Sequence, residues 1–343
     1  MLVGLPACTN LMHWGEPAAI CRTLLEAEME QAGGLIDVQT GIELLRAEHV
    51  VAIPTETVYG LAALAESAPA CSRIFTVKKR PAANPLIVHV ADGAMAAQIG
   101  RLDEVSQMLV RHFWPGPLTV VVDVAAQLPP AVTAGLNTVA MRCPAHTMAL
   151  QIITGVGKPL VAPSANPSGT PSPTTAQHVL SDYDGRIPVI DGGSCRIGLE
   201  STVVRVTGGA VHILRPGAIV RAQLQRVVPL PVVTTPLTGT DVVRSPGTRF
   251  RHYAPYAAVE LFTDADELEQ ALENRPNVVV LSELRPRTEC RWRVLDAATL
   301  YSEFRRADAV GVEKILVLCS GEVLTNEALM DRLHRASQQH SRD

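Results

Sequence analysis

The sequence contains no long hydrophobic run. None of its apolar segments approaches the roughly 18 to 20 residues that a helix needs to cross a bilayer. The start of the chain carries several glutamates and lacks a basic segment followed by an apolar one, which argues against a secretory or organellar address. We therefore expect a soluble, cytoplasmic protein with no membrane partner.

Metal-binding cysteine patterns and a strong excess of charge are also absent. The 7 cysteines are scattered, with no Cys-x-x-Cys and no spacing suited to a zinc site, so we interpret them as reduced and mostly buried. The formal net charge of -4 excludes a protein coated with cations for wrapping nucleic acid. It leaves room for one basic cleft.

Several common catalytic motifs are missing as well. The sequence has no Gly-x-Gly-x-x-Gly after a strand, no Gly-x-Ser-x-Gly and no His-Glu-x-x-His. Residues 155–159 read Gly-Val-Gly-Lys-Pro and fail the P-loop pattern. These absences disfavour P-loop and dinucleotide-binding proteins, serine hydrolases and zinc proteases. A nucleotide would have to be bound by hydroxyls, helix-end amides and arginines.

Residues 78–89, which read Lys-Lys-Arg-Pro-Ala-Ala-Asn-Pro-Leu-Ile-Val-His, form the most distinctive stretch. Three adjacent cations end a predicted helix that opens near Ser67, and a proline prevents its continuation. A short apolar strand containing His89 follows, so the stretch predicts an anion-binding corner. Alternatively, the cations only complement the helix dipole in solvent, and His89 is a core residue.

Polar residues repeatedly lie at the ends of predicted strands. Residues 54–57 (Pro-Thr-Glu-Thr) follow the strand at 50–53, Arg142 ends the strand at 138–142, and Arg215 ends the strand at 212–214. Open α/β sheets bind ligands at the carboxyl ends of their strands. Each case alone is an ordinary turn, but together they indicate a site.

Residues 164–175 form a polar loop after the predicted strand at 160–163. We interpret Ser172 as a helix N-cap with Pro173 at the first helical position, where exposed amides would suit a phosphate. The alternative is a plain capping loop.

Composition divides the chain into parts. It is 47% hydrophobic over 343 residues, which suits a globular protein of two domains. Residues 228–257 are rich in Pro, Thr and Gly and predict a linker. Strands alternate with helices from residue 258 on and predict a small α/β domain with a mostly parallel sheet. We therefore expect an extension at 1–35, a larger domain at 36–227, the linker, and a C-terminal domain at 258–343.

Ordered motifs make the chain resemble the threonylcarbamoyl-AMP synthase family in its long, two-domain form. They are residues 54–60 (Pro-Thr-Glu-Thr-Val-Tyr-Gly), 78–81 (Lys-Lys-Arg-Pro), 84–89 (Asn-Pro-Leu-Ile-Val-His), 114–119 (Trp-Pro-Gly-Pro-Leu-Thr), 163–169 (Pro-Ser-Ala-Asn-Pro-Ser-Gly), 214–217 (Leu-Arg-Pro-Gly) and 252–255 (His-Tyr-Ala-Pro). The resemblance is strong over residues 37–255 and loose beyond. It implies an α/β fold, with a YrdC-like twisted open mixed sheet and helices, plus a small Rossmann-like α/β C-terminal domain.

The resemblance also implies a reaction and its partners. L-threonine, bicarbonate or CO2, and ATP would give threonylcarbamoyl-adenylate and pyrophosphate, with magnesium entering on the ATP. The product would pass to a tRNA threonylcarbamoyl transferase for modification of tRNA. Two alternatives are a double-stranded RNA-binding module without nucleotide chemistry, and a domain that makes an adenylate from carbamoyl phosphate.

Site residues carry over by motif. The resemblance makes Lys78 and Arg80 catalytic and implies no metal ligand from the chain. It places threonine on Thr55, Thr57, His89, Arg142, Ala162 and Ser201. It places ATP on Lys78, Arg80, Asn84, Thr138, Ser164, Asn166, Ser172, Arg215 and Tyr253. Tyr253 would close over the nucleotide as a lid, and the choice between Thr55 and Thr57 as direct ligand stays open.

Overall fold

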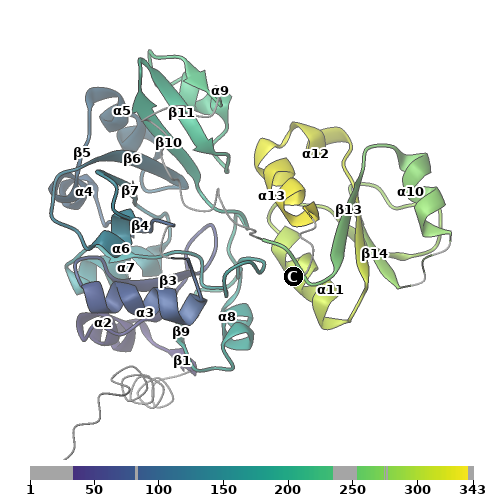
Figure 1. The fold of residues 1–343 in the computed structure, drawn as a ribbon, viewed down its shortest axis with the longest axis horizontal. Helices are drawn as coiled ribbons and strands as arrows, with labels where there is room; N and C mark the ends of the chain where they lie inside the picture. The colour runs from purple at the N-terminus through teal and green to yellow at the C-terminus, as the bar shows by residue number, and fades with distance from the viewer. Residues whose placement is uncertain (1–33, 82–83, 235–252, 274, 276, 339–343) are drawn as a thin grey trace, which may run out of the picture.

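The computed structural model describes residues 34–81, 84–234, 253–273, 275 and 277–338. The predicted extension, apart from its last two residues, and most of the predicted linker lie outside the described residues. Figure 1 shows a larger lobe, coloured purple to green, formed by the described residues up to 234, and a smaller lobe, coloured green to yellow, formed by the C-terminal part. No helix in the described ranges is long and apolar enough to span a membrane.

The larger domain is built on one mixed sheet, 12-stranded as far as the structure describes it. From one edge to the other, its strands are β1 (Gly34–Ile36), β9 (Pro188–Ile190), β2 (Val51–Ile53), β3 (Gly60–Leu64), β8 (Leu160–Val161), β4 (Ile87–His89), β7 (Thr138–Arg142), β6 (Leu118–Val124), β10 (Thr202–Thr207), β11 (Ala210–Arg215) and β12 (Val232–Val233). Strand β5 (Gly100–Arg101) pairs with β6 off this path. Valine, isoleucine and leucine from these strands fill the main core.

Helices flank this sheet, and short polar side chains fix where several of them begin. The helices are α2 (Val38–Arg46), α3 (Ala68–Lys78), α4 (Gly93–Ile99), α5 (Glu104–Phe113), α6 (Pro130–Thr133), α7 (Thr147–Val156), α8 (Ala176–Asp182) and α9 (Arg221–Gln225). Asp37 accepts the Thr40 amide at 2.8 Å, and Ser67 accepts the Ala70 amide at 3.2 Å. These contacts satisfy amides that the first helical turn leaves unpaired.

The smaller domain has four parallel strands in the order β13 (Ala258–Phe262), β16 (Lys314–Leu318), β14 (Val278–Ser282) and β15 (Arg291–Val294). Its helices are α10 (Ala265–Leu272), α11 (Leu300–Ala309), α12 (Gly321–Thr325) and α13 (Glu327–Ser337). The predicted fold class is therefore confirmed: a large mixed sheet with helices, plus a small parallel α/β domain.

One local prediction was wrong. Ser172 is not a helix N-cap, because α8 begins at Ala176 and the Thr175 hydroxyl accepts the His178 amide at 3.3 Å. The Ser172 hydroxyl instead donates to Glu200 at 2.6 Å. Pro173 also is not helical, since its carbonyl accepts the Tyr59 amide at 2.9 Å. Contacts distant in sequence therefore hold this loop extended.

Candidate functional site

Side chains from many separate segments meet at one pocket in the larger domain. It is lined by Thr55, Thr57, Val58, Gly60, Arg80, Pro85, Ile87, His89, Arg142, Ala162, Pro163, Ser164, Asn166, Glu200, Ser201, Arg215 and Tyr253. Strands β4, β7 and β11 supply their carboxyl ends, whereas β10 supplies its amino end because the sheet is mixed. The convergence predicted from strand ends thus brings three arginines and several hydroxyls together.

Arg142 organises one end of the pocket. Its guanidinium lies 2.7 Å from Glu56 Oε1, donates to Thr57 Oγ1 at 2.8 Å, and donates to the Gly116 carbonyl at 3.2 Å. Burial opposes ionisation of Glu56, but Arg142 and the Ala145 amide hold the pKa of that carboxyl below its ordinary value. Glu56 is therefore an ionised partner that orients Arg142.

The two threonines differ in how their hydroxyls are used. Thr55 Oγ1 donates to the Val58 carbonyl at 2.6 Å and accepts the Thr57 amide at 3.2 Å. The two hydroxyl oxygens are 2.9 Å apart and share a hydrogen bond. Thr55 shapes the turn, whereas Thr57 faces Arg142, and both line the pocket.

His89 and Ser201 also line the pocket. Burial, with a smaller contribution from Arg142, lowers the pKa of His89 to about 3, so its ring is neutral near pH 7. The ring nitrogen Nδ1 lies 3.2 Å from the Ile87 carbonyl. The Ser201 hydroxyl is 2.8 Å from that of Thr119. Ala162, which follows β8, completes this wall.

The predicted cationic triplet separates into three environments. Lys78 is 1% exposed, and its ammonium donates to the Ser164 and Asn166 carbonyls beside the pocket. Lys79 is exposed in the left-handed conformation that ends α3. Arg80 lines the pocket, donates to the Pro85 carbonyl at 3.0 Å, and has its pKa lowered to about 10 by burial. Only Arg80 of the three presents its cation to the pocket.

Several of the remaining residues predicted on the nucleotide side line the pocket or adjoin a lining residue. Ser164, Asn166 and Arg215 line it, and the Arg215 guanidinium donates to the Ser201 carbonyl at 2.9 Å. Asn84 precedes the lining residue Pro85.

Thr138 and Ser172 are not among the lining residues. Thr138 begins β7, four positions before Arg142 and on the same face of that strand. Ser172 reaches the pocket indirectly through its hydrogen bond to Glu200.

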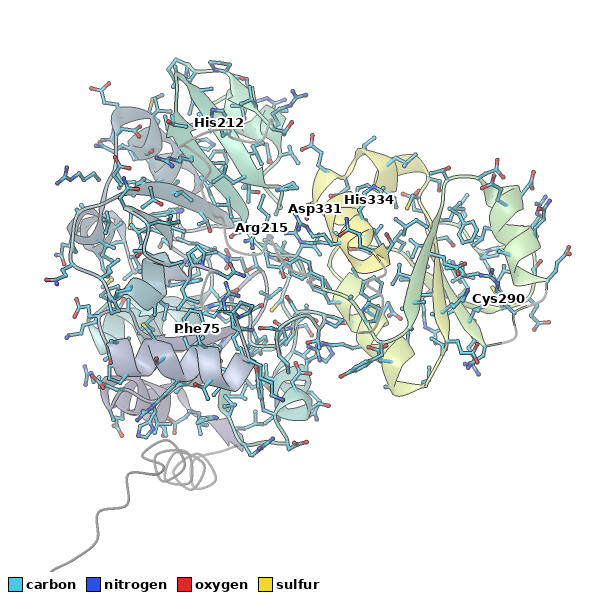
Figure 2. The ribbon with its side chains drawn as sticks, in the orientation of Figure 1. Phe75, His212, Arg215, Cys290, Asp331 and His334 are labelled. Atoms are coloured by element: carbon cyan, nitrogen blue, oxygen red, sulfur yellow. The ribbon has the colours of Figure 1, made fainter. Side chains whose placement is uncertain are left out.

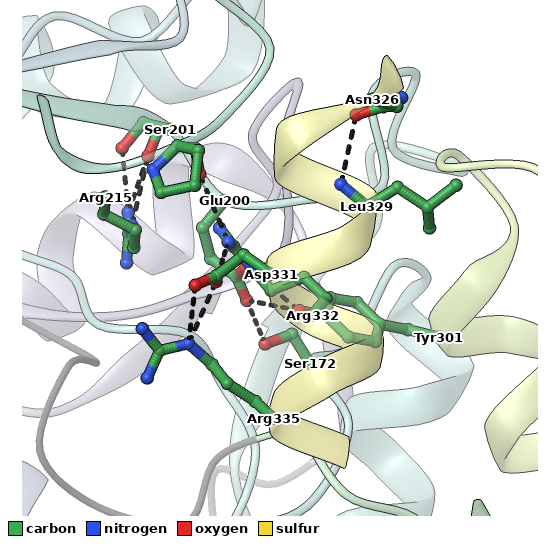
Figure 3. Close-up of polar contacts among 11 residues, drawn as sticks. Ser172, Glu200, Ser201, Arg215, Tyr301, Asn326, Leu329, Asp331, Arg332 and Arg335 are labelled. Atoms are coloured by element: carbon green, nitrogen blue, oxygen red, sulfur yellow. Dashed lines mark hydrogen bonds and ion pairs between the residues drawn. The ribbon is translucent and has the colours of Figure 1, made fainter. Parts of the chain in front are cut away.

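A second polar cluster joins the pocket to the smaller domain and was not predicted. Glu200 lines the pocket and accepts hydrogen bonds from Ser172 at 2.6 Å, from Tyr301 at 3.0 Å and from Arg332 at 2.9 Å (Figure 3). Figure 2 shows Arg215 and Asp331 at the boundary of the two lobes. Sequence position gives no signal for this pairing, because Arg332 follows Glu200 by more than a hundred residues.

Tyr253 lies within this cluster. Its ring stacks on Tyr301 with centroids 5.6 Å apart, and the Arg332 guanidinium carbon lies 5.2 Å from its centroid. The ring is also part of the pocket wall. The end of the predicted linker thus contacts both domains.

Comparison with known proteins identifies two family matches. The family described as "Telomere recombination" matches residues 43–217, and the one described as "Threonylcarbamoyl-AMP synthase, C-terminal domain" matches residues 219–338.

Individual relatives agree over most of the chain. A threonylcarbamoyl-AMP synthase of Pyrococcus abyssi is 38% identical over 85% of this chain and 92% of the relative. One from Bacillus subtilis is 45% identical over 67% of each chain. The crystal structure of P. abyssi Sua5 complexed with L-threonine superposes with a TM-score of 0.80 at 36% identity, covering 89% of this chain and 97% of that chain.

Proposed function

The chain belongs to the two-domain threonylcarbamoyl-AMP synthase family, and we propose that the pocket of its larger domain is where the reaction takes place. The enzyme is a nucleotidyltransferase that makes L-threonylcarbamoyladenylate and pyrophosphate from L-threonine, bicarbonate or CO2, and ATP, for tRNA modification. The observation that supports this location is the convergence of three arginines and several hydroxyls from distant segments on one pocket.

We propose that threonine binds at the Arg142 end. The Arg142 guanidinium, oriented by Glu56, would pair with the threonine carboxylate. Thr57 or Thr55, neutral His89 and Ser201 would contact the rest of the amino acid and its carbamate, together with the backbone at Ala162. That the relative P. abyssi Sua5 has been crystallised with L-threonine supports threonine as a ligand of this fold.

The nucleotide would occupy the Arg80 and Arg215 side. These two guanidiniums suit phosphate oxygens, since arginine offers paired donors in a planar arrangement. Lys78 would act there by fixing the loop at Ser164 and Asn166, whose carbonyls its ammonium binds. The other predicted nucleotide contacts are Asn84, Thr138, Ser172 and Tyr253.

The chemistry then requires positioning and charge stabilisation. The threonine amine combines with bicarbonate to give a carbamate and water, or with CO2 to give a carbamate and a proton. One carbamate oxygen attacks the α-phosphorus of ATP, and the bond to the bridging oxygen of the departing pyrophosphate breaks. Negative charge develops on phosphate oxygens, where fixed arginines stabilise it. Arg80 is the residue we assign to that role.

Magnesium would enter on the phosphates of ATP and neutralise part of their charge. The pocket carboxylates of Glu56 and Glu200 are both ion-paired with arginines. In the part of the chain that the structure describes, no cluster of three or more His, Cys, Asp or Glu could hold a metal ion. The residues present therefore do not form a dedicated cage.

We also propose the division into domains and the fate of the product. The catalytic domain would span residues 36–227, the linker 228–257 and the C-terminal domain 258–343, with Tyr253 as a lid that closes on binding. In the cytoplasm, the product would be handed to a tRNA threonylcarbamoyl transferase.

The test is threonine dependence. Purified protein supplied with ATP, magnesium and bicarbonate should release pyrophosphate only after L-threonine is added. Release that ignores threonine would contradict the pocket assignment. Salt-sensitive binding of double-stranded RNA without ATP consumption would support the RNA-binding alternative instead.

A further inference from the structure

Arg332 of α13 contacts the other domain at two points, one of them the lining residue Glu200. Its side chain is 0% exposed. Nε donates to Glu200 Oε2 at 2.9 Å, and a terminal nitrogen donates to the Pro216 carbonyl at 3.1 Å. Glu200 immediately precedes Ser201, and Pro216 immediately follows Arg215.

Those two neighbours are joined to each other. The Arg215 guanidinium donates to the Ser201 carbonyl at 2.9 Å and to the Ser201 hydroxyl at 3.1 Å. Ser201 leads into β10 and Arg215 ends β11, and the two strands are antiparallel. Arg332 therefore holds together the end of the β10–β11 hairpin that carries one residue proposed for each substrate.

Arg332 also holds the ring of Tyr253. The guanidinium carbon lies 5.2 Å from the ring centroid, and Tyr301 stacks on that ring. Tyr253 has a φ of 69°, a left-handed conformation that a residue with a bulky side chain rarely adopts. Such a conformation persists where surrounding contacts determine it, and Arg332 and Tyr301 supply them.

The buried Glu200 carboxylate requires a cation beside it, and the two contacts of that cation require the planar guanidinium of arginine. Burial opposes ionisation of Glu200, but Arg332 and Arg215 hold its pKa below the ordinary value. Hydrogen bonds from Ser172 and Tyr301 complete the shell of the carboxylate. A lysine at position 332 would keep the charge, but it has no planar fork that could reach Glu200 and Pro216 together.

We propose that Arg332 is a positioning residue for the reaction, through which the small domain fixes Ser201, Arg215 and Tyr253 in the pocket. It acts without touching substrate. The proposal rests on the proposed function of the pocket. It gives the C-terminal domain a part in the active site itself.

The first experiment compares Arg332→Lys with Arg305→Lys. Arg305 is a matched control because it also crosses the domain boundary, with an ion pair to Asp182 at 2.7 Å, but Asp182 does not line the pocket, whereas the Arg332 partner Glu200 does. Arg332→Lys should raise KM for threonine or ATP and lower kcat/KM by about tenfold or more, since ångström-scale misplacement costs up to about 10²-fold. Arg305→Lys should stay within about twofold by the same reasoning.

KM is the informative quantity. A merely structural role would reduce the fraction of folded enzyme and hence the apparent kcat, but it would leave KM of the folded molecules unchanged. KM values for Arg332→Lys that equal those of Arg305→Lys would overturn the proposal. Wild-type enzyme in the same assay tests the proposed function separately from the role of Arg332. Pyrophosphate release without threonine would reject the proposed function before any variant is compared.

A second variant covers the case in which Arg332→Lys does not fold. Removing one partner of a buried ion pair leaves an uncompensated charge, whereas removing both does not. Glu200→Gln combined with Arg332→Met keeps the volume and abolishes both charges. A raised KM in this folded double variant supports the proposal, and wild-type KM values overturn it.

Discussion

Arg142 is the residue on which the proposed threonine site most depends. Arg142→Ala should raise KM for threonine about 10- to 100-fold, because a charge-assisted hydrogen bond contributes about 1.5–3 kcal/mol. KM for ATP should change little. Steady-state pyrophosphate release, with each substrate varied in turn, measures both.

A control separates this effect from general damage. Arg142→Ala leaves Glu56 buried without its partner, so thermal melting should accompany the kinetics. Arg186→Ala removes an exposed ion pair to Asp184, with the two side chains 55% and 80% exposed, and should alter neither KM. Equal losses for threonine and ATP in Arg142→Ala would reject the assignment.

His89 should make stability depend on pH. Its pKa is about 3 in the folded protein and near 6.5 when exposed, so the unfolded chain binds the extra proton between these values. Stability is therefore fully present above pH 6.5 and falls as pH decreases. Between pH 6.5 and pH 5 the loss should be about 1.6 kcal/mol, at 1.36 kcal/mol per pKa unit, because half of the unfolded chains already carry the proton at pH 6.5.

Urea unfolding of wild type and His89→Gln at both pH values checks this. The variant should lose less stability on acidification than the wild type. His178, whose pKa is lowered to about 4, acts in the same direction, but it contributes equally to both proteins and cancels in the difference. Identical pH dependence of the two proteins would show that His89 titrates normally.

At the residue scale, the sequence indicated which side chains lie at the pocket more reliably than it indicated the role of each one. The pattern Lys-Lys-Arg-Pro predicted a basic corner, but the left-handed backbone at Lys79 decides that Lys78 turns inward and Lys79 outward. Glu200 was not predicted as a site residue, because its role depends on an ion pair with Arg332 in the other domain. Local pattern carries no information about such a partner.

At the scale of elements, the end of α3 offers a direct test. Lys79 has a φ of 50°, which costs free energy for any residue with a Cβ, and its amide caps the helix. Lys79→Gly should therefore raise the free energy of unfolding by up to about 1 kcal/mol. Lys79→Ala removes the same charge but keeps the Cβ, so it should give no gain. Chemical denaturation of the wild type, Lys79→Gly and Lys79→Ala measures the three free energies of unfolding. Equal values would contradict a strained backbone at Lys79.

Elements with a strong local pattern were predictable, and those set by distant contacts were not. The helix predicted to open near Ser67 is α3, which Ser67 caps, and the strand predicted at 138–142 is β7. Strand β15 is hard to predict because Arg291–Val294 is only four residues long, lies at the sheet edge, and has arginine at two of its positions. The helix start at Ser172 was misplaced because its hydroxyl is engaged by Glu200.

At the scale of the molecule, the two-domain division followed from composition, but the contact between the domains did not. A Cβ at Gly198 would lie 2.2 Å from the Ala298 carbonyl oxygen, so the two backbones meet directly at a glycine with a φ of 76°. Such a close approach depends on how the surfaces of the two folded domains fit together. Neither surface has a sequence pattern that predicts the other.

Tyr253 tests whether this contact serves the reaction. Its ring is 5% exposed and held between Arg332 and Tyr301, whereas Tyr256, three residues later, is 82% exposed. Tyr253→Ala should lower kcat/KM by about tenfold or more, because the proposed lid could then no longer close, and the nucleotide would be misplaced and exposed to water. Tyr256→Ala removes an equal side chain from the same segment and should leave the kinetics unchanged. Measured pyrophosphate release that is equal in the two variants would mean that the Tyr253 ring only joins the domains and has no part in turnover.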